Sequence, residues 1–333
     1  MATLPFLPVS SSKLIGIARL AAEGESLRQG HAVEYFTLPA RSLLNRCTGV
    51  RMPFTWTINP YRGCEFACKY CYARYTHEFM EMRDGVDFEQ KIYVKQHAAE
   101  PLQQELRRVK PGEEIAIGTA TDPYQPAERR FEVTRVILEE LARHRGLEIG
   151  LITKGNLILR DVDLLKELAR NNRLFVNLTI TTLNVELARI LEPRAPRPDL
   201  RMETVHKLSQ AGIAVGVSCS PVIPGITDAP KNLEALVRAA AAAGGKHVFA
   251  NPLFLKPCSA AVFMPFLEKE FPQLAAEYRQ RYKDRAFLPN SYGKRISQLM
   301  TRLRQKYGMV RGGERYGPKS PVLQREGEQM ALF

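Results

Sequence analysis

Three cysteines lie within eight residues of one another, and their spacing is the strongest chemical signal in the chain. Cys64, Cys68 and Cys71 follow the pattern C-x3-C-x2-C inside the segment NPYRGCEFACKYCYAR. Thiolates at such spacing bind a metal ion or an iron–sulfur cluster. A structural zinc site needs four ligands, and His77 is the residue that would complete one. Three thiolates alone suit a [4Fe-4S] cluster whose fourth iron has no protein ligand and stays open to a bound molecule.

The elements that must position this loop alternate between short apolar strands and helical patterns. Expected strands are 54–59, 114–119, 148–154, 174–180, 214–219 and 247–254, with helices near 98–109, 129–145, 161–171, 199–211 and 230–243. Nearly continuous apolar strands are typical of a parallel sheet that is buried on both faces. Six successive strand–helix units predict an α/β fold, a partial (β/α)6 barrel of the TIM type. Functional groups should then gather at the carboxyl ends of the strands.

The flanks of this barrel differ from it in composition. We expect a basic N-terminal extension over 1–50, the barrel over 51–258, a C-terminal helical region over 259–306 and a flexible basic tail over 307–333. The tail is rich in Gly, Arg and Pro, which disfavours a packed core. This organisation predicts that the chemistry resides in the barrel.

Charge and hydropathy limit the class of protein. The chain has 48 Lys and Arg against 35 Asp and Glu, a net charge of +13, which favours a polyanionic partner such as nucleic acid. The ordinary globular composition, 45% hydrophobic and 25% charged, excludes a wholly disordered chain, a collagen or a coiled coil. Because we find no signal peptide and no long apolar run, we expect a cytoplasmic protein with no membrane partner.

Polar side chains recur at the ends of the expected strands, where a ligand would lie. Inward-facing polar groups need partners because their burial alone is costly. Asp122 can also serve a turn before Pro123, and Lys154 can also be a solvated lysine at a strand end. The candidates are Thr119, Thr121 and Asp122 after the second strand, Lys154 at the end of the third, Asn177 and Thr179 along the fourth, and Ser218 on the fifth.

Together with the cysteine motif, the segments GTATDPYQPAE, ITKGN, LEPRAP and SPVIPGITD resemble the spore photoproduct lyase-like branch of the radical S-adenosylmethionine (SAM) superfamily. The resemblance covers about residues 40–255. It implies that Cys64, Cys68 and Cys71 hold a [4Fe-4S] cluster and that SAM binds the open iron. It also implies that the polar residues at the strand ends contact SAM, with Lys154 pairing with its carboxylate.

The same resemblance implies a reaction. One electron from the cluster would cleave SAM into methionine and a 5′-deoxyadenosyl radical, which abstracts a hydrogen atom from the substrate. The expected function is a DNA repair lyase that reverses a thymine-dimer photoproduct of the spore photoproduct type, as a monomer supplied with electrons by a donor such as flavodoxin or ferredoxin. Two alternatives stay open: a radical SAM enzyme that modifies RNA, a nucleotide or a peptide, and a non-catalytic iron–sulfur protein associated with DNA.

One feature departs from the lyase pattern. Characterised spore photoproduct lyases carry a hydrogen-donor cysteine shortly after the second strand, whereas this chain reads GTATDPYQP there, without a thiol. If a hydrogen atom returns to the product, its donor lies elsewhere. Cys258 is the first candidate and Cys219 the second, because both follow or end strands on the expected active face. Tyr70 and Tyr72 are the remaining candidates, through their phenolic hydrogens.

Basic residues and a terminal peptide suggest macromolecular partners. Gln329, Leu332 and Phe333 end the chain as QMALF, which resembles the peptide that docks repair and replication proteins on the bacterial sliding clamp. The alternative is a short tail that packs on its own domain. For the basic residues, the alternatives are solvated helix faces and a disordered tail. The expected nucleic-acid contacts are Arg285, Arg302, Arg304, Arg311, Arg315 and Tyr316, and binding to DNA would associate the protein with the nucleoid.

Overall fold

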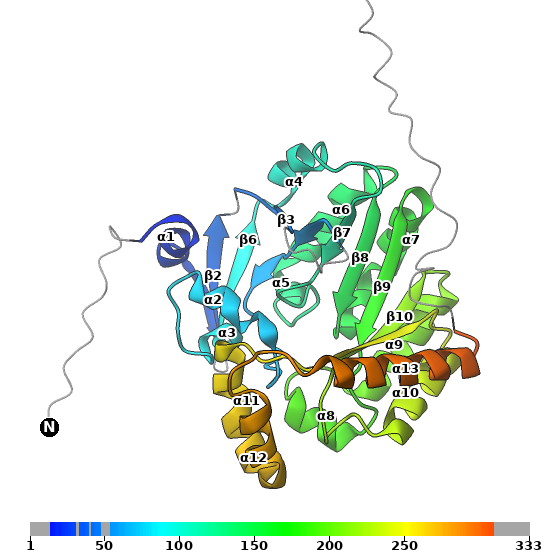
Figure 1. Cartoon of the computed structure of the whole chain (residues 1–333). Coiled ribbons are helices and arrows are strands. Elements are labelled where there is room, and N and C mark those ends of the chain that lie inside the picture. Colours follow the sequence, from blue (N-terminus) through cyan, green and yellow to red (C-terminus); the bar gives the residue numbers. More distant parts are fainter. Residues whose placement is uncertain (1–13, 31–32, 40, 48–53, 310–333) are drawn as a thin grey trace, which may run out of the picture.

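The computed structural model describes residues 14–30, 33–39, 41–47 and 54–309, and a seven-stranded sheet forms its centre (Figure 1). Six strands run parallel in the order β11-β10-β9-β8-β7-β4, which confirms the partial (β/α)6 barrel. A short antiparallel strand, β3 (Leu44–Arg46), adds to the edge beside β4. The parallel strands are β4 (Trp56–Ile58), β7 (Glu114–Ile117), β8 (Glu148–Thr153), β9 (Arg173–Thr179), β10 (Val215–Val222) and β11 (Val248–Pro252).

One face of the barrel strands packs against helices. Ile58, Ile117, Leu151, Val176 and Val215 are register partners in one row across the sheet, and all belong to the main hydrophobic core. Because strand residues alternate between faces, the intervening positions point into the barrel. The helices along the barrel are α4 (Ala99–Leu106), α5 (Glu128–Phe131), α6 (Val133–Ala142), α7 (Val162–Asn171), α8 (Val185–Leu191), α9 (Pro198–Gln210) and α10 (Pro230–Ala242).

The expected helix near 129–145 is divided into α5 and α6. Glu132 lies between them in the left-handed region, with a φ of 50°. The buried carboxylate of Glu128 accepts hydrogen bonds from the amides of Thr134 (2.8 Å) and Arg135 (3.2 Å) in the first turn of α6. These contacts satisfy amides that have no partner within the helix, so a tertiary interaction stabilises the break.

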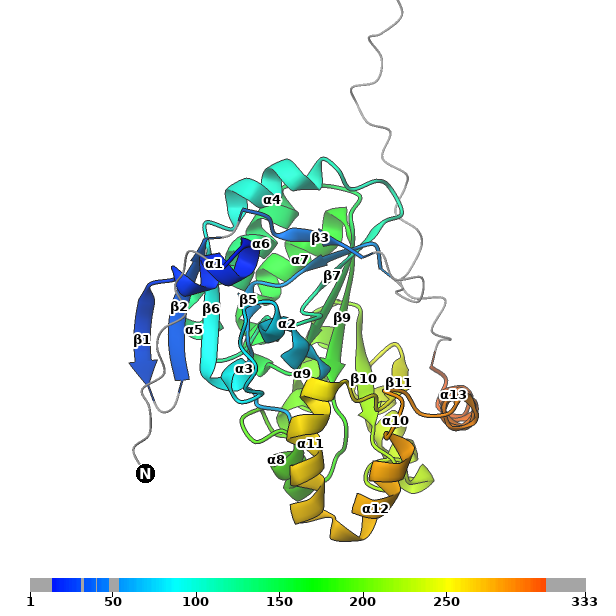
Figure 2. The same ribbon diagram turned by 60° about the vertical axis from the view of Figure 1, so that its left-hand side comes forward.

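A second, four-stranded sheet lies beside the barrel, in the order β1-β2-β6-β5, with the helix α1 (Gly16–Ala22) packed on it (Figure 2). The sequence patterns predicted none of these strands. The edge strand β5 follows β4 directly in the chain and leads into the cysteine loop. The small sheet therefore supports this loop from one side. Its strands are β1 (Ser26–Gly30), β2 (Val33–Pro39), β6 (Lys91–Gln96) and β5 (Tyr61–Arg62).

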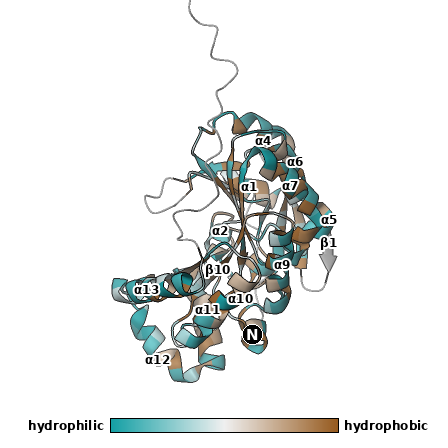
Figure 3. Cartoon of the chain, turned by 90° about the vertical axis from the view of Figure 1, so that its right-hand side faces the viewer, coloured by the Kyte–Doolittle hydropathy of each residue, from teal (hydrophilic) through white to brown (hydrophobic). Residues whose placement is uncertain are grey.

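Three helices follow the barrel: α11 (Pro257–Glu270), α12 (Pro272–Arg281) and α13 (Asn290–Lys306). The first packs against the turn that follows the cysteines, and α13 packs against β11 and α10. The hydropathy colouring shows α13 as mostly hydrophilic (Figure 3). Among the described residues, no helix has the length and apolar character needed to cross a membrane.

Candidate active site at the carboxyl ends of the barrel strands

The cysteine loop begins at a position that only glycine can occupy. Gly63 has a φ of 84°, and an added Cβ would lie 2.7 Å from the carbonyl oxygen of Lys91. The next residue, Cys64, donates its amide to the carbonyl of Phe88 (2.8 Å). Thr121 donates its hydroxyl to the Gly63 carbonyl (2.6 Å), which ties the loop to the end of β7. The residues after β7 therefore position the first cysteine.

A buried arginine holds the middle of the loop. Arg74, in the 3-10 turn η2 (Tyr72–Arg74), is 2% exposed and donates to the carbonyl of Cys68 (3.0 Å) and to the carboxylate of Glu89 (2.9 Å). Ser259 of α11 donates its hydroxyl to the carbonyl of Cys71 (3.0 Å). The backbone of the loop is thus held by the surrounding protein, and the thiols are left for a ligand.

The three thiols share a buried environment. Cys64 and Cys68 are buried and Cys71 is half-buried. Burial raises the pKa of Cys64 well above its usual value, and the negative charges of Asp122 and the other two thiols add to the increase. Burial also raises the pKa of Cys68 to about 12, although the Lys154 cation opposes this increase. Thiols of this kind become thiolates when a metal binds them.

The donor set fits a cluster better than a single ion. Among the described residues, no three His, Cys, Asp or Glu side chains converge closely enough to hold one metal ion. In a [4Fe-4S] cluster each thiolate binds a different iron, so the thiols lie farther apart than the ligands of one zinc ion. The expected fourth zinc ligand, His77, is engaged elsewhere, with its Nε2 3.1 Å from the Lys91 carbonyl. This geometry does not support the zinc alternative.

Asp122 connects the ends of two barrel strands. Its carboxylate accepts hydrogen bonds from the Thr153 hydroxyl (2.5 Å), the Lys154 amide (2.7 Å) and the Tyr124 amide (3.0 Å). Burial raises the pKa of Asp122, and these hydrogen bonds oppose the increase. These bonds tie Asp122 to the end of β8, and the bond to the Lys154 amide fixes the backbone from which the lysine side chain extends.

A buried network of charges lies behind the cysteines. Arg201 and Glu192 form an ion pair (2.6 Å) with both side chains almost fully buried, and the Tyr70 hydroxyl donates to the same carboxylate. The ammonium of Lys154 lies 5.7 Å from the centre of the Tyr70 ring. Burial alone would lower the pKa of Lys154, but the negative charges of Cys68 and Glu192 outweigh it, so the pKa is raised. Lys154 is therefore a stable cation beside the thiols.

Three expected polar residues meet on the inner face of the barrel. Thr179 on β9 and Ser218 on β10 are register partners, and both are buried. Asn177, two residues earlier on β9, is 6% exposed, and its Oδ1 has no hydrogen-bond partner in the described part of the chain. A buried amide oxygen of this kind is suited to accept a hydrogen bond from a bound molecule. Another threonine of the candidate set, Thr119, lies after β7 and accepts a hydrogen bond from the Asn59 side chain through its Oγ1 (3.3 Å).

The two cysteines expected as hydrogen-atom donors occupy different positions in the fold. Cys219 is wrong as an active-face residue, because β10 continues to Val222 and alternation turns Cys219 toward the helices with Val215 and Val217. It is fully buried, and its Sγ lies 3.8 Å from the carbonyl oxygen of Thr181. The half-buried Cys258 lies in the first turn of α11, next to the serine that bonds Cys71.

Sequence reasoning missed one thiol near this site. Cys47 follows β3 at the barrel edge. In the structure it hydrogen-bonds the side chain of Thr57. Burial raises the pKa values of both Tyr72 and Tyr75, and the negative charge of Cys47 adds to the increase. No local sequence signal marks Cys47, because only the antiparallel pairing of β3 with β4 brings it here.

Three aromatic rings extend from the cysteine loop across the mouth of the barrel, and we call them the aromatic row. Tyr72 lies 5.3 Å from Phe254 (centroid to centroid), and Phe254 stacks on Phe287 at 5.2 Å. Tyr72 is 38% exposed and Phe287 is 58% exposed, although both are large aromatic side chains. The Tyr72 hydroxyl donates to the Thr119 carbonyl, which fixes this end of the row at the end of β7. Arg285, two residues before Phe287, is exposed.

The other expected nucleic-acid contacts differ in exposure. Arg302 on α13 is exposed, whereas Arg304 turns inward and donates to the Val248 carbonyl (2.9 Å) and the Thr301 hydroxyl (3.1 Å). This favours a structural role for Arg304, in which it attaches α13 to β11. The remaining expected contacts lie outside the described residues: Arg311, Arg315, Tyr316, Gln329, Leu332 and Phe333.

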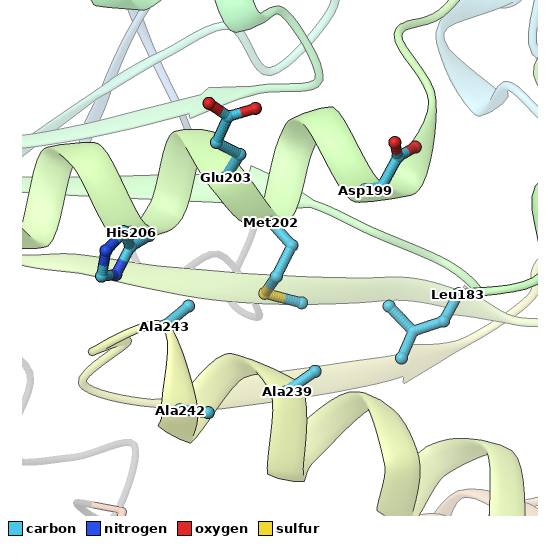
Figure 4. A pocket seen from close by; sticks show the side chains of 8 residues that line it. All are labelled: Leu183, Asp199, Met202, Glu203, His206, Ala239, Ala242 and Ala243. Carbon is cyan, nitrogen blue, oxygen red and sulfur yellow. The ribbon is translucent and has the colours of Figure 1, made fainter.

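A separate open pocket of about 620 Å³ lies between α9 and α10 (Figure 4). It is lined by Met202 and His206 of α9, by Ala239 and Ala242 of α10, and by Ala243 directly after that helix. These helices cover the outer side of the strands, so this cavity is distinct from the barrel interior. Its lining includes none of the residues that surround the thiols.

Comparison with known proteins agrees with this site. The radical SAM superfamily model matches residues 58–238, which include the cysteine loop and the polar strand ends. An uncharacterized protein of Mycobacterium tuberculosis is 34% identical over 331 residues, which are 98% of this chain and 96% of that protein. Another uncharacterized protein, from Methanocaldococcus jannaschii, is 28% identical over 66% of this chain and 77% of that protein.

Solved structures share the fold. Spore photoproduct lyase complexed with dinucleoside spore photoproduct superposes with a TM-score of 0.62 at 15% identity, over 90% of this chain and 86% of that one. A mutant of that enzyme with bound AdoMet and the same dinucleoside gives a TM-score of 0.60 at 14% identity, over the same shares of the two chains. From the family match, the cysteine motif and the barrel, we conclude that this chain belongs to the radical SAM superfamily, whose members use a [4Fe-4S] cluster and SAM.

Proposed function

We propose that this radical SAM enzyme is a lyase that reverses a thymine-dimer photoproduct of the spore photoproduct type in DNA. The observation that carries the proposal is the aromatic row, which begins beside the cluster ligand Cys71 and ends at the exposed Phe287. Exposed rings stack on nucleobases whatever their sequence, and the chain carries a net charge of +13 that favours a phosphate backbone. The fold shared with spore photoproduct lyase supports the choice of lesion.

In this proposal each part of the site has a separate task. The cluster held by Cys64, Cys68 and Cys71, together with SAM, supplies the one-electron chemistry that removes a hydrogen atom from the substrate. The Lys154 cation pairs with the carboxylate of SAM. The Oδ1 of Asn177 accepts a hydrogen bond that SAM donates. The barrel walls exclude water and stray hydrogen donors from the reacting atoms.

The substrate test is an anaerobic incubation of the purified protein with SAM, dithionite and a synthetic dinucleoside photoproduct. We expect the lesion to be converted to two thymines, detected by chromatography, and no conversion with the Cys68→Ala variant. A cyclobutane thymine dimer serves as the alternative lesion. If the wild type cleaves SAM but converts neither lesion, the DNA lyase proposal is wrong, and RNA, nucleotides and peptides become the substrates to test.

The hydrogen donor of this reaction is proposed to be Cys258. Its half-buried position beside the cysteine loop is compatible with access to the substrate, whereas Cys219 faces the helices. The Cys258→Ala variant should still cleave SAM and open the dimer, because bond scission precedes hydrogen return. It should then accumulate aberrant adducts in place of thymine. Clean product from Cys258→Ala would transfer the role to Cys47 or Tyr72, which the corresponding Ala and Phe variants test.

Two partners remain predictions from the sequence. An electron donor such as flavodoxin or ferredoxin would reduce the cluster, and the terminal QMALF would dock on a sliding clamp. A synthetic peptide with this ending should compete with the full-length protein for the clamp. A peptide with Ala in place of Gln329, Leu332 and Phe333 is the matched control.

A further inference from the structure

A second pocket, of about 480 Å³, lies between α1, the small sheet and β3, and we call it the Lys95 pocket. Figure 2 shows α1 beside the strands of the small sheet that form its wall. Its charged lining is one-sided, because four cations face a single carboxylate, Glu23, which is already paired with Arg19 (2.7 Å). The four cations are Arg19, Arg41, Arg62 and Lys95.

Lys95 is an unusual residue to find at such a position. It is 7% exposed on β6, and within the described residues its ammonium makes no hydrogen bond or ion pair. In the carboxylate that acts on it, Glu105, the Oε2 accepts hydrogen bonds from the amides of Leu43 and Leu44 (2.9 Å each). The pKa of Lys95 is lowered to about 7, mainly by burial and also by the Arg62 cation, while Glu105 opposes the decrease. An ammonium with so little exposure is costly to keep charged, and an anion bound in the pocket would offset that cost.

The neighbouring arginine also has unused donors. Arg62 of β5 is half-buried, and the Nε of its guanidinium is buried without a hydrogen-bond partner among the residues described. Its hydrogen bond from Nη1 to the Thr76 carbonyl is long, at 3.4 Å. Ser42 and Asn45 add neutral polar groups to the same lining. The pocket thus offers a planar guanidinium, a compact ammonium and neutral donors around one cavity.

We propose that the Lys95 pocket binds a phosphoryl group, with Arg62 and Lys95 as its principal ligands. A guanidinium matches two oxygens of a phosphate at once, and an ammonium adds a point charge, so this pair suits a tetrahedral oxyanion. The phosphoryl group can belong to the backbone of a nucleic-acid strand or to a small molecule such as a free nucleotide. The inference is independent of the lyase reaction proposed above, because it rests on residues of the small sheet and not on the barrel site.

The first test measures the thermal unfolding of the full-length protein with increasing inorganic phosphate, at an ionic strength kept constant with sodium chloride. A ligand that binds only the folded state raises Tm in a saturable way. We expect this rise for the wild type and for Lys110→Met, an exposed-lysine control with the same change of charge. Lys95→Met should bind phosphate about tenfold more weakly or worse, because it loses a charged hydrogen bond.

A second arm identifies the source of the phosphoryl group. If it comes from a strand, Lys95→Met should weaken the binding of a single-stranded oligonucleotide and reduce the salt slope by about 0.7. If oligonucleotide binding is unchanged while the phosphate response is lost, the ligand is a small molecule. Should Lys95→Met fail to fold, the exposed Arg41→Ala variant replaces it, with a weaker phosphate response expected. An equal rise in Tm for the wild type and the pocket variant, or no rise for the wild type, would overturn the proposal.

Discussion

Each of the three loop cysteines is predicted to be indispensable for iron binding. Substituting Cys64, Cys68 or Cys71 by Ala should reduce the iron content of the reconstituted protein from about four per chain and abolish SAM cleavage. The reason is that each thiolate binds its own iron, so no second ligand compensates for a loss. Iron analysis and chromatography of 5′-deoxyadenosine measure the two effects. Cys219→Ala is the control and should keep both, since that thiol faces the helices.

The buried lysine of the small sheet predicts a specific pH dependence. Its pKa is lowered from 10.5 to about 7 in the folded protein, so between these values the unfolded chain binds more protons than the folded one. The contribution of Lys95 to the free energy of unfolding therefore rises from pH 7 to pH 10.5 and is lost as the pH falls to 7. Its full size is on the order of 5 kcal/mol.

Urea unfolding of Lys95→Met and the wild type at pH 7 and pH 9.5 measures this effect. We expect Lys95→Met to be more stable than the wild type at pH 7, and the difference to shrink at pH 9.5. Lys110→Met controls for the loss of a surface charge. A variant that is less stable than the wild type at both pH values would show that the protein uses the Lys95 cation for its own structure.

How far the site can be predicted from sequence depends on how local its signals are. The cysteines were predictable because ligand type and spacing lie within one loop. Cys219 was misplaced because the face of a strand residue depends on where the strand ends, and β10 runs three residues beyond it. The ion pair of Glu192 with Arg201 links the end of α8 to α9 only after folding. Neither segment contains a sequence pattern that predicts this pair.

At the scale of elements, the aromatic row predicts a base-stacking surface. Phe287→Ala removes a ring that is 58% exposed, so the fold should tolerate it. The binding of the Phe287→Ala variant to a single-stranded oligonucleotide should weaken by about 1–3 kcal/mol, the usual contribution of one stacked base. Phe79→Ala is the matched control, because that ring is also 58% exposed but packs edge-on against Tyr75 outside the row. Fluorescence anisotropy measures both, and equal affinities would argue against stacking on this row.

Sequence patterns predicted some of the strands and missed others. The six parallel strands were predicted because they are short apolar runs, most of them buried on both faces; β11 is only partly buried. The small sheet was missed because β5 has only two residues, and β2 is half-buried along most of its length without alternation. These strands are stable only through pairing across the chain, as β2 and β6 pair between residues 34 and 96. Their existence therefore depends on tertiary structure.

At the scale of the whole molecule, the net charge of +13 predicts that binding to a strand is mainly electrostatic. Each phosphate neutralised by a cation releases counterions, so log affinity should fall linearly with log salt, at about −0.7 per contact for a single strand. With about three contacts, affinity should drop by roughly tenfold or more between 50 and 200 mM salt. A dinucleoside without phosphate groups should bind with little salt dependence, because it offers stacking and no backbone charge. A flat response for the oligonucleotide as well would mean that the basic surface does not bind a strand, and would favour a small-molecule or peptide substrate for this barrel.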